Sequence, residues 1–137
     1  MAAPGETLVR AYMTALNDDD VALHREAVSE DFELVEAPAL PGAAHPRGAD
    51  ALERYWRGWK RNWTEWRWTP VLIEEAGDRV LLQADLWLRA THTGIALEKR
   101  WWYGFTVADG RVARQEGFDS DDEDGARAAF RAGPLPG

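Results

Sequence analysis

The sequence has 137 residues, eight of them tryptophan, no cysteine and a formal net charge of −8 at pH 7. This length fits one domain with a hydrophobic core, expected to span residues 1–137 with the folded part at about 6–132. The negative charge repels phosphate groups, so neither nucleic acid nor a membrane surface is expected as a partner. Without cysteine, disulfides and thiolate chemistry are excluded. No apolar run reaches the ~20 residues of a membrane span and no signal peptide is visible, so we expect a cytoplasmic protein.

The hydrophobic pattern predicts helices mainly in the first half of the chain and strands mainly in the second. The predicted helices cover residues 6–17, 21–28, 51–62 and 120–131, and the predicted strands cover 31–36, 66–75, 79–91, 96–107 and 111–119. Tight-turn signals join the last four strands into an antiparallel meander, which twists and curls. We therefore expect an α+β fold in which a cone-shaped, strongly curved antiparallel sheet of about four to six strands packs on three helices from the N-terminal half, with a short C-terminal helix.

The helix over 51–62 begins with a capping-box pattern, Asp50 with Glu53, and carries tryptophan on one face. Its indoles are expected to face the sheet, while its arginines lie on another face. Most of the tryptophans can be simple core residues. An indole-walled cavity with a few polar groups also suits a flat apolar ligand, so we expect a small apolar molecule as partner. The expected ligand-binding residues are Trp56, Trp59, Trp63, Trp87, Trp102, Tyr103, Tyr55 and Phe118.

The order of these elements and several short motifs resemble the SnoaL-like group of the nuclear transport factor two-like superfamily. The resemblance covers about residues 6–132 and implies the same curved-sheet fold. It implies no single activity, because members include polyketide cyclases, ketosteroid isomerases, limonene epoxide hydrolases and dehydratases. The motifs that carry it are Gly48-Ala-Asp-Ala-Leu52, Ala76-Gly-Asp-Arg-Val80, Thr91-His-Thr-Gly94, Asp109-Gly-Arg-Val112 and Gly117-Phe-Asp119.

Asp119, at the end of the last predicted strand, is the first candidate catalytic residue. The resemblance places the acid/base aspartate of SnoaL-type cyclases there. A carboxylate near Phe118 and several indoles is expected to be partly desolvated, which suits proton abstraction next to a carbonyl. Gln83 or a tyrosine would then stabilise the oxyanion. The alternative is that Asp119 caps the helix that follows it.

Asp85 is the second candidate and leads to different chemistry. The epoxide hydrolase pattern has Arg-x-Asp on this strand, aimed into the pocket, and the matching residues here are Gln83-x-Asp85. If the match holds, the face with Gln83, Asp85 and Trp87 lines the cavity, and Asp85 shares a water with Asp119. The missing arginine argues against this activity, and simple alternation would turn the polar face to solvent instead.

The ketosteroid isomerase pattern fits less well. Its base is an aspartate directly before a proline in the loop after the first strand, where this chain has Ala37-Pro38. Glu36 is adjacent but is expected to point to the other side of the extended chain. Without a Cys/His cluster, a phosphate loop or a serine triad, neither a metal nor another cofactor is expected.

Three functions therefore stay open. The first is an enzyme of polyketide cyclase or isomerase type that acts on a small apolar carbonyl compound, with Asp119 as acid/base. The second is an epoxide-hydrolase-like enzyme that uses Asp85 and Asp119 with a water. The third is a non-catalytic ligand-binding or dimerisation domain. A homodimer is expected in each case, because open curved sheets with an apolar outer face tend to pair.

Overall fold

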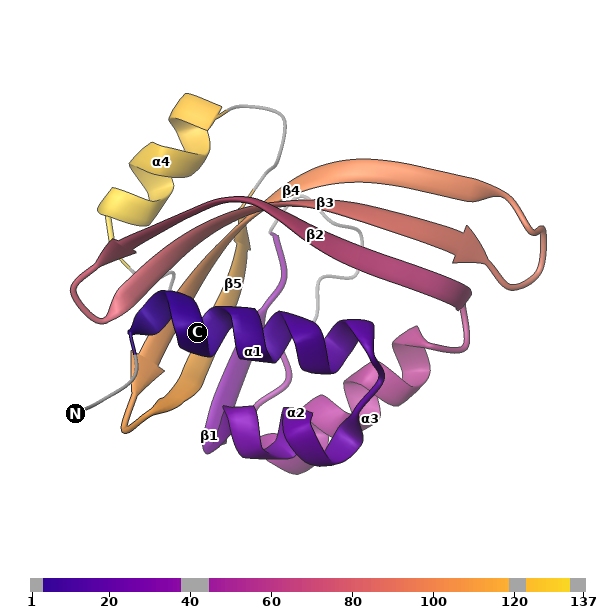
Figure 1. Cartoon of the computed structure of the whole chain (residues 1–137), viewed down its shortest axis with the longest axis horizontal. Helices are drawn as coiled ribbons and strands as arrows, with labels where there is room; N and C mark the ends of the chain where they lie inside the picture. The colour runs from indigo at the N-terminus through magenta and orange to yellow at the C-terminus, as the bar shows by residue number, and fades with distance from the viewer. Residues whose placement is uncertain (1–3, 38–44, 119–122, 134–137) are drawn as a thin grey trace.

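The computed structural model describes residues 4–37, 45–118 and 123–133 and confirms the predicted α+β fold (Figure 1). In these residues the elements are α1 (Gly5–Asn17), α2 (Val21–Ala27), β1 (Val28–Val35), α3 (Ala49–Trp59), β2 (Trp63–Ala76), β3 (Arg79–Ala90), β4 (Ala96–Ala108), β5 (Arg111–Phe118) and α4 (Glu123–Arg131). Within the same ranges, no helix is both long and apolar enough to cross a membrane.

The five strands form one curved sheet in the order β1-β5-β4-β3-β2. The strands β2 to β5 make the predicted antiparallel meander. The strand β1 differs from the prediction, because it pairs with β5 in parallel. No tight turn joins these two strands, since α3 and three strands lie between them along the chain, and only a tight turn would force an antiparallel pair. Figure 1 shows α1, α2 and α3 on one side of the sheet and α4 on the other.

The sheet is the middle layer between two hydrophobic clusters. Alternate residues of β3 supply both: Leu82, Ala84 and Leu86 face the larger cluster with α1 and α3, whereas Leu81 faces the smaller cluster under α4. Each fully buried leucine in these clusters stabilises the fold by roughly 1.5–3 kcal/mol. We call the side toward α1 and α3 the inner face, and the side toward α4 the outer face.

A buried ion pair fixes α4 to the outer face. The Glu116 carboxylate, on β5, is 1% exposed and pairs with the guanidinium of Arg79 on β3. Arg79 also donates to the carbonyl oxygen of Phe130 in α4. The same cation therefore holds two strands and the last helix together.

Hydrogen bonds likewise tie the end of α1 to β2 on the inner face. Asn17 Nδ2 donates to the Trp68 carbonyl oxygen, and the Trp68 N–H donates back to Asn17 Oδ1, each at 2.8 Å. Trp66 Nε1 donates to the Leu16 carbonyl oxygen at 2.8 Å. These bonds hold two indoles of β2 against the helices.

The predicted capping box at the start of α3 is not formed. Gly48 is the N-cap, at φ 87°, and makes no side-chain cap. Asp50 and Glu53 instead accept hydrogen bonds from Arg25 of α2, at 2.6 and 3.1 Å. α3 begins at Ala49, so Asp50 lies inside the first turn of the helix and not at the N-cap position that a capping box requires.

Candidate functional site

A cavity of about 290 Å³ lies between the inner face of the sheet, the end of β1 and α3. Its walls are mainly aromatic and aliphatic, and Glu36 is the only charged side chain among the described residues that line it. We call it the inner cavity. Its lining residues are Leu34, Val35, Glu36, Ala37, Tyr55, Trp56, Trp59, Trp63, Trp68, Leu86, Leu88, Trp101, Tyr103, Gln115 and Gly117.

Three indoles form one wall of the inner cavity. Trp59 of α3 stacks on Trp68 of β2 with ring centroids 5.2 Å apart. Trp56 meets these two rings edge-on, at centroid distances of 5.4 and 5.9 Å. Such stacked and edge-to-face contacts stabilise ring pairs beyond simple burial and fix the ring orientations. The structure therefore presents a firm indole surface to the contents of the cavity.

Glu36 faces the inner cavity, where the Tyr55 hydroxyl donates a hydrogen bond to Glu36 Oε1. The prediction that Glu36 points away was wrong. β1 ends at Val35. The chain therefore leaves the strand before Glu36, strict alternation ceases, and both Glu36 and Ala37 line the cavity.

The other polar groups at the cavity are hydroxyls and an amide. Tyr12 donates to Gln115 Oε1 at 2.7 Å, and Trp68 Nε1 donates to the Tyr103 hydroxyl at 3.4 Å. Burial raises the pKa of Tyr12 and Tyr103 well above the usual value. The pKa of Tyr55 is raised too, first by burial and then by its bond to Glu36. All three hydroxyls therefore keep their protons at neutral pH. Tyr55 and Tyr103 line the cavity and can serve as donors there, whereas Tyr12 is not a lining residue and donates to Gln115.

Asp85, Gln83 and Trp87 lie on the outer face and do not line the cavity, in contrast to the arrangement that the epoxide hydrolase pattern predicted. On β3, the leucine-rich face is the one that meets the helices, because it packs into the larger cluster. Asp85 accepts two hydrogen bonds from Arg100, at 2.7 and 3.1 Å. The hydrogen bond from Arg100 lowers the pKa of Asp85 and keeps this carboxylate ionised.

Trp102 and Phe118 also lie on the outer face, in the cluster under α4. Trp101 lines the inner cavity in place of Trp102. This follows from the alternation of side chains along β4. Trp101 lies on the same face of the strand as Tyr103, which lines the cavity, and Trp102 lies on the opposite face. Asp119 follows Phe118 directly and lies outside the described residues.

Comparisons with known proteins identify the family. A model of the SnoaL-like domain matches residues 9–115, which is most of the chain. The chain belongs to the SnoaL-like family. A search of curated proteins found no match.

Solved structures show the same fold. A proposed polyketide cyclase from Sinorhizobium meliloti is 25% identical with a TM-score of 0.68, over 84% of this chain and 94% of that one. TerC, crystallised with polyporic acid, is 19% identical with a TM-score of 0.76, over 95% and 97%. An NTF2-like protein of unknown function from Burkholderia pseudomallei is 18% identical with a TM-score of 0.74, over 93% and 95%. These matches confirm the predicted fold.

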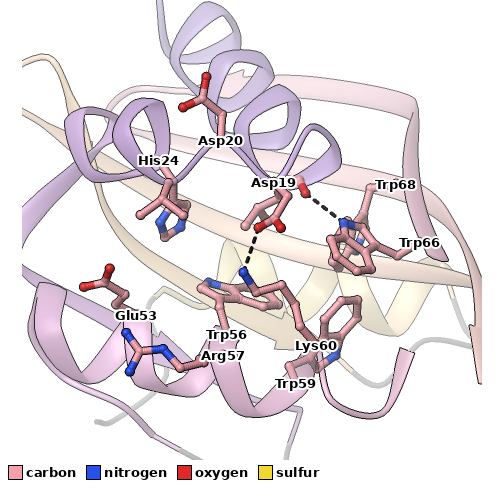
Figure 2. Close-up of a pocket in the computed structure, with 12 residues that line it drawn as sticks. Asp19, Asp20, His24, Glu53, Trp56, Arg57, Trp59, Lys60, Trp66 and Trp68 are labelled. Atoms are coloured by element: carbon pink, nitrogen blue, oxygen red, sulfur yellow. Dashed lines mark hydrogen bonds and ion pairs between the residues drawn. The ribbon is translucent and has the colours of Figure 1, made fainter. Parts of the chain in front are cut away.

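The SnoaL-like domain has a second, smaller pocket of about 100 Å³, between the α1–α2 turn and α3 (Figure 2). It shares Trp56, Trp59 and Trp68 with the inner cavity, so the same indoles contribute to both spaces. Lys60 Nζ, at the end of α3, lies 2.7 Å from Asp19 Oδ1 in the turn. Figure 2 shows this pair bridging the turn and α3. We assign the pocket no ligand, because its space is small and its Lys60 and Asp19 side chains already pair with each other.

His24 lines this pocket, where burial lowers its pKa. In the unfolded chain, His24 takes up a proton more readily than in the folded one. Acid therefore favours unfolding, so the stability of the folded chain is fully present above about pH 6.5 with respect to His24 and falls as the pH drops below it. We expect His24→Gln to reduce the drop in melting temperature between about pH 7.5 and about pH 5.5, measured by circular dichroism. His92→Gln, in the exposed β3–β4 turn, is the matched control. An unchanged drop in the His24 variant would contradict this expectation.

Proposed function

We propose that this SnoaL-like domain binds a small, flat, apolar carbonyl compound in the inner cavity and transfers a proton on it, as an enzyme of polyketide cyclase or isomerase type. The observation that carries the proposal is an aromatic cavity whose polar side chains, among the described residues that line it and apart from the indoles, are a carboxylate, two tyrosine hydroxyls and an amide. A few polar groups on apolar walls orient a ligand and leave its rings to be held by burial.

The size of the inner cavity favours a small compound. At about 290 Å³ it stands at the lower end of the volumes typical of ligand sites. The indole wall supplies flat surfaces for ring stacking. We therefore expect molecules of about two fused rings to fit better than larger ring systems.

Asp119 remains the proposed acid/base of this reaction. The proposal rests on the resemblance to SnoaL-type cyclases and on the position of Asp119 directly after Phe118 in the sequence. Epoxide hydrolysis with Asp85 has less support, since this residue is paired with Arg100 on the outer face. The homodimer also remains a proposal, and the mass of the protein measured by sedimentation equilibrium tests it.

The bicyclic ketone 2-tetralone provides the test. We expect the protein to bind it, as measured by titration calorimetry, and to speed exchange of the hydrogens next to its carbonyl with deuterium from D2O, as measured by NMR. Asp119→Asn should lower this exchange rate by about 100-fold or more with little change in affinity, the usual size of an acid/base contribution. Binding without exchange would identify a non-catalytic binding domain. Polyporic acid, present in the TerC crystal, is a second compound to titrate.

A further inference from the structure

We propose that Glu36 is a catalytic carboxylate of the inner cavity, which takes the proton from the carbon next to the ligand carbonyl, and that Tyr55 positions it. This inference rests on the proposed ligand and reaction and assigns the proton abstraction to Glu36 in place of Asp119, so Asp119→Asn should then keep most of the exchange rate. It names the group that meets the reacting C–H bond and the kind of substrate that this group requires, a ketone with an enolisable carbon.

The position of Glu36 is the first argument. It is the only charged side chain among the described residues of the cavity lining, and its neighbours on β1, Leu34 and Val35, are apolar. A charged group is costly to place in such surroundings unless hydrogen bonds hold it. If this position served only to pack the core, an apolar side chain would fill it without that cost in free energy. The carboxylate is thus the cavity group best suited to exchange a proton with bound material.

Tyr55 supplies the second argument. It comes from α3, on the far side of the cavity from the sheet, and its hydroxyl donates to Glu36 Oε1. Burial and this bond together raise the pKa of Tyr55, so its hydroxyl stays protonated and remains the donor of the pair. The bond restricts the rotation of Glu36 and fixes the carboxylate at the cavity wall. An oriented base is the more effective one, because less rotational freedom is lost on reaching the transition state.

Donors for the developing oxyanion lie in the same cavity. The Tyr103 hydroxyl accepts from Trp68 Nε1 and keeps its own proton. The side-chain oxygen of Gln115 accepts a hydrogen bond from Tyr12. The side-chain N–H groups of Gln115 are therefore the ones that can donate to a ligand. Donors directed at the oxygen on which charge develops lower the barrier to proton abstraction.

The reaction step balances with these groups alone. A carboxylate oxygen of Glu36 takes the proton, the C–H electron pair becomes a carbon–carbon double bond, and the carbonyl oxygen receives the negative charge. In D2O the proton on Glu36 exchanges with solvent, and deuterium returns to carbon. With a second carbonyl in the substrate, the enolate carbon would attack it, a C–C bond would form, and the new alkoxide would take the proton from Glu36. No oxidant or reductant is needed.

The test measures hydrogen exchange of 2-tetralone with the purified full chain and with Glu36→Gln. We expect the variant to lower the catalysed rate by about 100-fold or more while the dissociation constant stays within about twofold. Glutamine has the same shape and can still accept from Tyr55, and thermal unfolding of the variant checks that it folds. Glu36→Asp should recover part of the rate, because it restores the carboxylate at a shorter reach. The matched control is Glu65→Gln, an exposed carboxylate of β2 that pairs with Arg89.

The possible outcomes separate this inference from the proposed function. If the wild-type chain binds 2-tetralone and catalyses exchange, and Glu36→Gln exchanges at the wild-type rate, the role of Glu36 is wrong. If exchange then fails only in Asp119→Asn, the proton is taken by Asp119. If the wild-type chain binds the ketone without exchange, the inference falls and ligand binding stands. If it does not bind the ketone, the proposed ligand class fails, and the role of Glu36 fails with it.

Discussion

Replacing Trp102 by alanine is expected to lower the free energy of unfolding by about 3–5 kcal/mol, the usual cost of deleting a buried aromatic side chain. Trp102 is 1% exposed and packs in the cluster under α4 with Leu81, Phe118 and Phe130. This cluster is separated from the inner cavity by the sheet. The affinity for 2-tetralone should therefore stay within about twofold of the wild-type value where the variant is folded.

Trp101→Ala is the matched comparison and should behave in the opposite way. Trp101 is half-buried, lines the inner cavity and has Lys99 Nζ 4.5 Å from its ring centroid. Its loss removes part of the ligand-binding wall, so we expect binding of 2-tetralone to weaken by about tenfold, with a smaller loss of stability. Urea denaturation and titration calorimetry measure the two effects. A binding defect in Trp102→Ala, with none in Trp101→Ala, would show that the faces of β4 are assigned wrongly.

The second large effect is expected from Glu116→Ala, which should cost about 3–5 kcal/mol of unfolding free energy. The carboxylate is buried with Arg79, and Arg114 lies 3.9 Å away. Its removal leaves the Arg79 guanidinium, whose side chain is 13% exposed, without the carboxylate that compensates its burial. Because Arg79 also binds the Phe130 carbonyl, α4 should loosen as well.

An exposed ion pair that also reaches α4 provides the control for this prediction. Glu74 of β2 pairs with Arg127 at 2.7 Å, and its side chain is 50% exposed. Glu74→Ala should change stability little, because solvent screens such pairs. Replacing both Arg79 and Glu116 by methionine should recover part of the loss, since two apolar side chains leave no buried charge. If Glu116→Ala and Glu74→Ala had equal effects in urea denaturation, the buried pair would not carry the stability assigned to it.

Much of the fold could be predicted from local pattern. Helical spacing indicated α1, α2 and α3, and alternation with tight-turn signals indicated the meander from β2 to β5. These features depend on residues close together in the chain, so periodicity and turn chemistry suffice. The partner of β1 does not follow from local pattern. Its parallel pairing with β5 joins residues more than eighty positions apart, such as Val35 and Glu116, and no local signal specifies it.

The site was predictable only in part, for the same reason. Trp56 and Trp59 lie one helical turn apart on α3, and this spacing alone brings both to one wall. The orientation of β3 could not be predicted in this way. Alternation places Asp85 and the leucines on opposite faces of the strand, but it does not indicate which face meets the helices. Glu36 escaped prediction because β1 ends one residue before it.

The sequence by itself determined the elements, the curved meander, the family and the set of tryptophans available for a cavity. The tertiary structure decided which of them meet. Both faces of β3 and β4 carry large apolar side chains, so hydrophobic burial alone leaves their orientation open. Packing of α1 and α3 on one face and α4 on the other resolves it, since each helix buries its apolar stripe against a separate cluster. This choice places Glu36, Tyr55, Tyr103 and Trp101 at the inner cavity, and leaves Asp85 and Trp102 on the outer face.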